Sequence, residues 1–259
     1  MEELKRIVVL VDADNTQLTK LESVIREVSA RGRIVVKRAY GNWKKECLKN
    51  WENELKRLAI KAEQQFDYVA GKNVTDIALV IDAINLLNKK IYDAFVIVAS
   101  DSDYTPLAIN LHESGVYVMG VGEKKTPESF RNSCDEFVFL ENIPGEANEL
   151  ESGDDMQLDS KSTTIDHDES ESKAGENIDV VHYLLKEAFD KYQDGDGFVN
   201  VSSAGTFIKR VKPDFDVRSF GYVKLPKLIE SFPDKYEMKS YPGKGTVTII
   251  AYRCIDNKV

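Results

Sequence analysis

The sequence predicts an α/β fold: a doubly wound parallel sheet, followed by an acidic disordered linker and a small winged-helix α+β domain. Through residues 1–143, short apolar runs alternate with helical patterns, as in parallel sheets whose strands are joined by helices. The runs Ile7–Val11 and Phe95–Ala99 are apolar on both faces, which is typical of strands covered by helices on both sides. This periodicity stops near Pro144 and returns near Ile178.

The first expected strand, Ile7–Val11, is bounded by charged residues on both sides. The helical spacing of the apolar residues that follow predicts a helix over residues 20–30. Thr16 or Thr19 is expected to cap this helix, and Gly32 is expected to end it.

The remaining elements of the first domain follow from the same two periodicities. Further strands are expected at residues 34–39, 66–69, 95–99, 116–121 and 137–140. Helices are expected through Trp51, Leu55, Leu58 and Ala62 and at residues 77–87, 105–114 and 127–133. The helix at 77–87 has Asp76 in its first turn and Asp82 further along.

Residues 144–177 carry a net charge of −9, which equals the net charge of the whole chain. Low hydrophobicity combined with like charge predicts a disordered tether. Beyond this linker, helices are expected at 178–192, 203–211 and 223–231, a short strand at 198–201, and a hairpin of 237–240 with 246–252. Three helices followed by a hairpin indicate a winged-helix domain over residues 178–255.

The cysteines and histidines argue against several classes of chemistry. Cys47, Cys134 and Cys254 are far apart and form no Cys-x-x-Cys pair, which disfavours disulfides, zinc and redox chemistry. The three histidines are equally scattered, so no Ser-His or Cys-His pair is apparent. We find no run of 18 apolar residues and no signal-peptide pattern, and we therefore expect a cytoplasmic protein that does not enter a membrane.

Acidic side chains follow the first and fourth expected strands. Asp12 follows the first, Asp101 and Asp103 follow the fourth, and Asp76 begins the helix at 77–87. In open α/β sheets, ligands bind in the crevice beyond the carboxyl ends of the strands. Four carboxylates in one crevice repel one another unless a cation lies among them, and oxygen ligands suit Mg²⁺ or Mn²⁺. The alternative is that Asp76 and Asp103 only cap helices.

Three motifs together resemble the NYN domain, a branch of the PIN-like nuclease superfamily. They are VDADN at 11–15, the stretch 72–76 before the apolar helix, and ASDSDYTPL at 99–107, and their order and approximate spacing match over most of residues 1–143. The resemblance places four carboxylates on the family's acidic, metal-binding cluster and two polar residues beside it: Asp12, Asp76, Asp101 and Asp103, with Asn15 and Ser100.

This resemblance implies a metal-dependent ribonuclease whose cofactor is Mg²⁺ or Mn²⁺ and whose partner is RNA. Ala13 stands where many relatives have glycine, and Asp14 is an additional carboxylate without an assigned role. A catalytically silent RNA-binding adaptor is the alternative, because family members with only a binding role keep much of the same sequence.

The C-terminal part resembles the OST-HTH, or LOTUS, winged-helix domain. The matching stretches are DGFVNVSSAG at 196–205, PDFDVRSFGY at 213–222 and KLPKLIE at 224–230. This second resemblance implies RNA binding and contacts with a protein partner.

The stretch DADNT at 12–16 also fits the D-x-D-x-T motif of haloacid dehalogenase-type phosphatases. Asp12 would then be a covalent nucleophile and Asp14 an acid or base. That family also needs a later pair of acidic residues, and no expected strand after Asp103 ends in one. The phosphatase is therefore the lesser alternative.

Substrate contacts are predicted at four positions. Lys72 is close in sequence to Asp76 and is expected to meet a phosphate oxygen. Arg38, Trp43 and Lys44 combine positive charge with an aromatic ring, as do edges that track a phosphate backbone and stack its bases. An ordinary solvated face is the other interpretation of these three residues.

Overall fold

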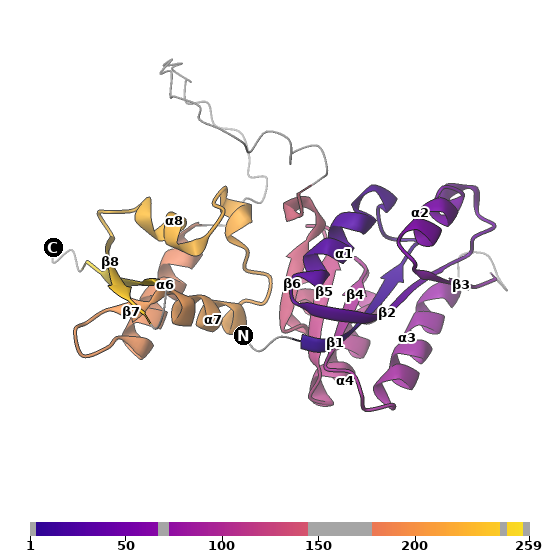
Figure 1. The fold of residues 1–259 in the computed structure, drawn as a ribbon, viewed down its shortest axis with the longest axis horizontal. Coiled ribbons are helices and arrows are strands. Elements are labelled where there is room, and N and C mark those ends of the chain that lie inside the picture. Colours follow the sequence, from indigo (N-terminus) through magenta and orange to yellow (C-terminus); the bar gives the residue numbers. More distant parts are fainter. Residues whose placement is uncertain (1–3, 67–72, 145–177, 244–247, 256–259) are drawn as a thin grey trace, which may run out of the picture. The chain divides into compact units, whose positions relative to one another are not determined.

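The computed structural model describes residues 4–66, 73–144, 178–243 and 248–255 (Figure 1). The chain divides into two compact units. The first contains the residues up to Pro144 together with Val201–Asp216, and the second contains the other described residues.

A six-stranded parallel sheet with the order β3-β2-β1-β4-β5-β6 forms the centre of the first unit. Its strands are β1 (Leu4–Asp12), β2 (Gly32–Gly41), β3 (Lys61–Gln64), β4 (Ala94–Val98), β5 (Tyr117–Gly122) and β6 (Glu136–Phe139). The chain proceeds outward from β1 in one direction and then, from β4 onward, in the other. The predicted doubly wound parallel sheet is confirmed.

Five helices of this unit pack on the two faces of the sheet: α1 (Leu21–Ser29), α2 (Trp51–Arg57), α3 (Val74–Leu87), α4 (Thr105–Glu113) and α5 (Glu128–Asn132). Ile7, Val9 and Val11 belong to one apolar cluster together with side chains of α1 and α2. Val8 and Leu10 belong to a second cluster with side chains of α3, α4 and α5. Both faces of β1 are therefore buried, as its apolar run predicts.

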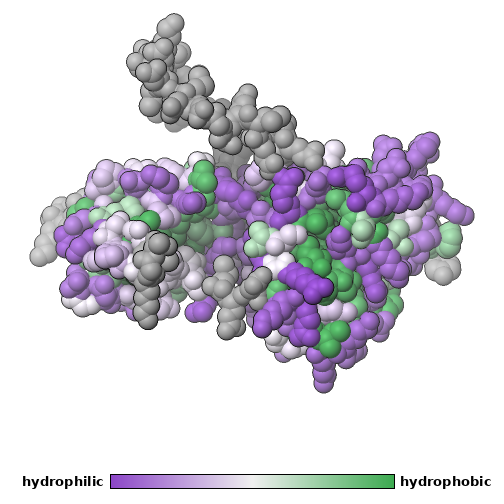
Figure 2. All heavy atoms as spheres, in the orientation of Figure 1, coloured by the Kyte–Doolittle hydropathy of each residue, from purple (hydrophilic) through white to green (hydrophobic). Residues whose placement is uncertain are grey.

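This burial fixes the position of the end of β1. Residues 7–11 are all at most 1% exposed, and each buried aliphatic side chain contributes about 1.5–3 kcal/mol to folding. Asp12 follows directly and shares this buried environment. Figure 2 shows hydrophilic residues over most of the visible face, with hydrophobic patches among them.

Two predicted elements near the sheet edge were wrong. The predicted helix through Ala62 ends at Arg57, because Ala59 adopts φ 51° and the chain then enters β3. Ala62 lies in β3, beside Ala39 of β2. The third strand was expected at 66–69, but β3 spans Lys61–Gln64, and residues 67–69 lie outside the described residues. β3 is a polar edge strand, so no apolar run marks it.

The predicted cap of the first helix was also wrong. A 3-10 turn, Leu18–Lys20, precedes α1, and Lys20 takes the N-cap position without a side-chain hydrogen bond. The Thr16 hydroxyl instead donates to the carbonyl of Val98 at 3.3 Å. Thr16 therefore joins the loop after β1 to the end of β4.

The C-terminal residues form a small α+β domain, as predicted. In chain order its elements are α6 (Ile178–Tyr192), β7 (Val199–Asn200), α7 (Val201–Val211), α8 (Leu225–Glu230), β8 (Tyr236–Pro242) and β9 (Thr248–Cys254). Of these, α7 falls within the first compact unit. The three strands form an antiparallel sheet in the order β7-β9-β8. Apart from Pro144, the predicted linker lies outside the described residues. Within the described ranges, no helix is long and apolar enough to cross a membrane.

Candidate functional site

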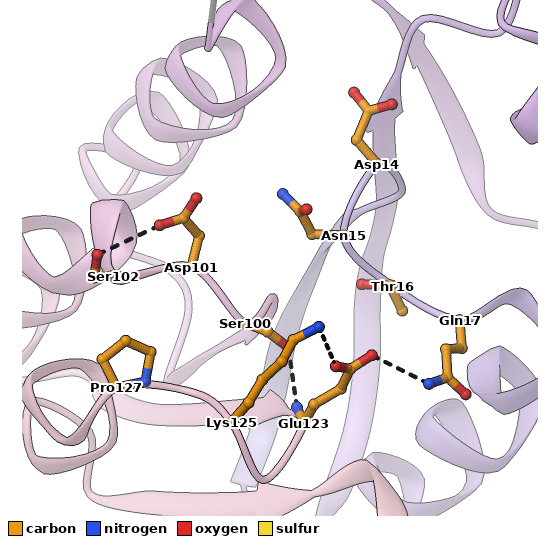
Figure 3. Close-up of a pocket in the computed structure, with 10 residues that line it drawn as sticks. All are labelled: Asp14, Asn15, Thr16, Gln17, Ser100, Asp101, Ser102, Glu123, Lys125 and Pro127. Carbon is orange, nitrogen blue, oxygen red and sulfur yellow. Dashed lines mark hydrogen bonds and ion pairs between the residues drawn. The ribbon is translucent and has the colours of Figure 1, made fainter. Parts of the chain in front are cut away.

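The candidate site lies where the strand order reverses, at the carboxyl ends of β1 and β4. Val11 and Val98 are register partners, so the residues after them leave the sheet at the same edge. This is the position where open α/β sheets bind ligands. A cavity of about 560 Å³ opens there, lined by Asp14, Asn15, Thr16, Gln17, Ser100, Asp101, Ser102, Glu123, Lys125 and Pro127 (Figure 3).

Asp12 is a completely buried carboxylate at this edge. Its Oδ1 accepts the backbone N–H of Asp14 at 3.1 Å, and its Oδ2 accepts Nδ2 of Asn15 at 2.9 Å. Burial raises the pKa of Asp12 to about 6, and the nearby charges of Asp76 and Asp14 act in the same direction. The Asp12 charge is thus held where it is costly, and a cation would offset that cost.

Tyr104 is a buried partner of Asp12 and Asp76, and it was not among the predicted site residues. Its hydroxyl donates to Oδ1 of Asp76 at 2.7 Å. Burial raises the pKa of Tyr104 far above its usual range, and the charge of Asp12 adds to this. The hydroxyl therefore keeps its proton and remains a donor. Its place inside the ASDSDYTPL motif is the only sequence signal for this role.

We expect Tyr104→Phe to lower the free energy of unfolding by about 1–3 kcal/mol, because a hydrogen bond to a charged acceptor is lost. Chemical denaturation measures this change. Tyr92→Phe is the matched control, since Tyr92 precedes β4 and packs on Phe95 at the other end of that strand. An effect no larger for Tyr104→Phe than for Tyr92→Phe would show that the hydroxyl does not support Asp76.

Asp101 and Asp103 are positioned by local hydrogen bonds. Asp101 accepts the backbone N–H of Asp103 at 3.1 Å and thereby caps the 3-10 helix Ser102–Tyr104. Asp103 accepts Nδ2 of Asn73 at 2.6 Å, which joins the start of α3 to the loop after β4. Helix capping is therefore observed at Asp101, whereas the alternative interpretation expected it at Asp103. Asp76 lies in the first turn of α3, as predicted.

Asp14 has a clear structural position. It accepts Nζ of Lys45 at 3.1 Å and Oγ1 of Thr75 at 3.1 Å. The additional carboxylate thus ties together the loop after β1, the loop after β2 and the start of α3.

Ser100 links the ends of β4 and β5. Its Oγ accepts the backbone N–H of Glu123 at 2.9 Å. A Cβ atom at Gly122 would lie 2.4 Å from the carbonyl oxygen of Ala99, so only glycine permits this close approach of the two strand ends.

The predicted substrate contacts have different environments. Nη1 of Arg38 lies 2.6 Å and 2.5 Å from the two carboxylate oxygens of Asp82, which also accepts the hydroxyl of Tyr40. The Trp43 ring lies 6.1 Å from that of Trp51, and its buried Nε1 has no hydrogen-bond partner among the residues that the structure describes. Lys44 lies over the Phe66 ring at 5.0 Å.

Lys72 lies outside the described residues. Of the remaining predicted residues, Asn15, Ser100 and Asp101 line the cavity, and Asp12 and Asp76 are coupled to each other electrostatically. The structure thus brings the ends of β1 and β4 and the start of α3 to one edge, while Arg38 is directed toward Asp82.

The donor chemistry of this edge fits a hard divalent cation. Within the described parts of the chain, no group of three or more His, Cys, Asp or Glu side chains is arranged to hold one metal ion. However, Mg²⁺ is usually bound through one or two carboxylates, with waters and substrate phosphates as its other ligands. Asp12, which is buried among like charges, and Asp101 suit such a partial set of protein ligands.

Comparisons with known proteins match both parts of the chain. The family model of the NYN domain matches residues 6–141, and that of the OST-HTH/LOTUS domain matches residues 178–248. No curated protein matches the chain.

Two solved structures of proteins without an assigned function show some likeness. A crystal structure of a protein from Vibrio parahaemolyticus is 17% identical, with a TM-score of 0.45, and the match covers 54% of this chain and 94% of that chain. An NMR structure of a protein from Nitrosomonas europaea is 23% identical, with a TM-score of 0.27, and the match covers 39% of this chain and 92% of that chain.

Proposed function

Because this chain belongs to the NYN domain family, we propose that it is a metal-dependent ribonuclease whose active site is the acidic edge at the ends of β1 and β4. The observation that supports this most strongly is Asp12, a fully buried carboxylate at the point where the strand order reverses. Functional sites frequently contain a buried ionisable group whose pKa is shifted by its surroundings. The OST-HTH/LOTUS domain suggests RNA binding and would add affinity for the substrate or for a protein partner.

In this proposal Asp12 and Asp101 hold Mg²⁺ or Mn²⁺, and Asp76 and Asp103 complete the site. Such an ion supplies an activated water and neutralises charge on the phosphate. Asn15 and the backbone N–H of Asp14 orient the Asp12 carboxylate. The Tyr104 hydroxyl orients Asp76. These residues bind and orient, so no covalent intermediate with the enzyme is needed.

A catalytically silent RNA-binding adaptor is the second candidate. It is favoured by one observation, the lack of a group of three or more potential metal ligands among the described residues. In an adaptor the same edge would bind RNA without breaking it. The NYN match spans the DADNT stretch on which the phosphatase alternative rests, and this disfavours the phosphatase.

A metal-titrated cleavage assay on mixed-sequence single-stranded RNA tests the proposal. We expect the full chain to cleave RNA when Mg²⁺ or Mn²⁺ is added, to stop when EDTA is present, and to recover when metal is restored. Shortened products on a gel measure the rate. RNA binding without cleavage at every metal concentration would instead identify the adaptor.

A further inference from the structure

The cavity at the acidic edge has a second wall that no sequence motif indicated. It is formed by Gln17, from the loop after β1, and by Glu123 and Lys125, from the loop after β5 (Figure 3). Nε2 of Gln17 donates to Oε1 of Glu123 at 3.1 Å. Nζ of Lys125 lies 2.6 Å from Oε2 of Glu123, so each oxygen of this carboxylate has a different partner.

The backbone beneath Lys125 is held firmly. The N–H of Glu123 is bonded to Ser100, and the carbonyl of Glu123 accepts both the hydroxyl of Thr126 at 2.6 Å and its N–H at 2.9 Å. Thr126 is only 2% exposed, and its buried side chain holds this turn against the rest of the unit. The Lys125 side chain itself is 75% exposed. Lys125 is thus an exposed cation on a hydrogen-bonded loop that lines the cavity.

Most of the charged side chains that line the cavity are acidic. Asp14, Asp101 and Glu123 are acidic, and Lys125 is the one cationic side chain among the described residues that line the cavity. A phosphodiester entering this acidic cavity would meet repulsion on its path unless a positive group faced it.

We propose that Lys125, oriented by Glu123 and Gln17, forms a phosphate subsite that binds the RNA backbone next to the bond to be cleaved. This inference rests on the proposed ribonuclease function. An ammonium group has three donors, so Lys125 can stay paired with Glu123 and still offer N–H groups to a phosphate oxygen. The Glu123 carboxylate raises the pKa of Lys125, which keeps this donor charged.

The ion pair between Lys125 and Glu123 is not expected to contribute much to the stability of the folded protein. Exposed ion pairs of this kind contribute little to folding. We therefore expect Lys125→Ala to fold and melt like the wild type. Any loss of RNA affinity in this variant would then report on the contact with substrate.

The test compares Lys125→Ala and Lys125→Arg with Lys124→Ala, each in the full chain. Lys124 is the matched control, because it is an exposed lysine in the same loop that does not line the cavity. We expect Lys125→Ala to raise the KM for a short oligoribonucleotide about tenfold, as expected for one lost charged contact. Lys125→Arg should restore most of this loss, and Lys124→Ala should leave KM within about twofold of wild type.

Binding of the same oligoribonucleotide, followed by fluorescence anisotropy in an Asp101→Asn background, gives a second readout that does not need turnover. Lys125→Ala should weaken binding and flatten its salt dependence by about 0.7 in log–log slope, the value for one phosphate of a single strand. Equal effects of Lys125→Ala and Lys124→Ala would overturn the subsite, whether or not the chain cleaves RNA. A binding loss specific to Lys125→Ala, combined with no cleavage by the wild-type chain at any metal concentration, would keep the subsite and overturn the ribonuclease.

Discussion

Asp12→Asn should abolish RNA cleavage and, at the same time, stabilise the metal-free protein at neutral pH. In the folded protein the pKa of Asp12 is raised to about 6, mainly by burial, and in the unfolded chain it is about 3.9. The stability contributed by the protonated carboxyl is therefore present below about pH 4 and is lost as the pH rises through about 6. The shift corresponds to about 3 kcal/mol at most.

Asparagine removes this cost but replaces one acceptor oxygen of Asp12 with a donor. Both oxygens accept hydrogen bonds, from Asp14 and from Asn15, so one of these bonds is weakened. We expect a net gain of about 1–2 kcal/mol at pH 7.5 that disappears near pH 4. Thermal unfolding in EDTA at both pH values measures it.

Asp93→Asn is the control for this prediction. Asp93 pairs with Arg6 at the opposite end of β4, so its variant should keep wild-type cleavage. If Asp12→Asn retained full activity and an unchanged melting temperature at both pH values, Asp12 would be neither a buried charge nor part of the active site.

Asp101→Asn should abolish cleavage with almost no change in stability. Asp101 caps the 3-10 helix Ser102–Tyr104 by accepting the N–H of Asp103. Asparagine caps helices about as well as aspartate, because its carbonyl oxygen accepts the same bond. The variant thus removes one charge and keeps the local structure. Chemical denaturation should give a free energy of unfolding within about 0.5 kcal/mol of wild type. A large loss of stability would assign Asp101 a structural role instead.

Most of the first unit could be predicted from the sequence because its strands are buried on both faces. The run Ile7–Val11 has no polar position, and both of its faces contact helices. The strand β3 could not be predicted in the same way, because Lys61–Gln64 is a short polar edge strand whose position depends on pairing with β2. Local patterns do not report such pairing.

The places of the predicted carboxylates could be read from the sequence, because they come directly after buried strands or at the start of a helix, whereas their role in a metal site stays a prediction. Their partners depend on tertiary contacts. Asp14 meets Lys45 and Thr75, which are 31 and 61 residues further along the chain. Lys125 likewise reaches the cavity only because β5 lies beside β4. The charges of these residues and their spacing along the chain do not predict these contacts.

We propose that the acidic edge at the ends of β1 and β4 cleaves RNA with the help of a divalent cation. Cleavage of the same RNA by wild type and Asp101→Asn, purified identically and both shown to bind that RNA, tests it most directly. We expect products from wild type only when Mg²⁺ or Mn²⁺ is present, and none from Asp101→Asn under any condition. Equal cleavage by the two proteins, or none by wild type at any metal concentration, would contradict it.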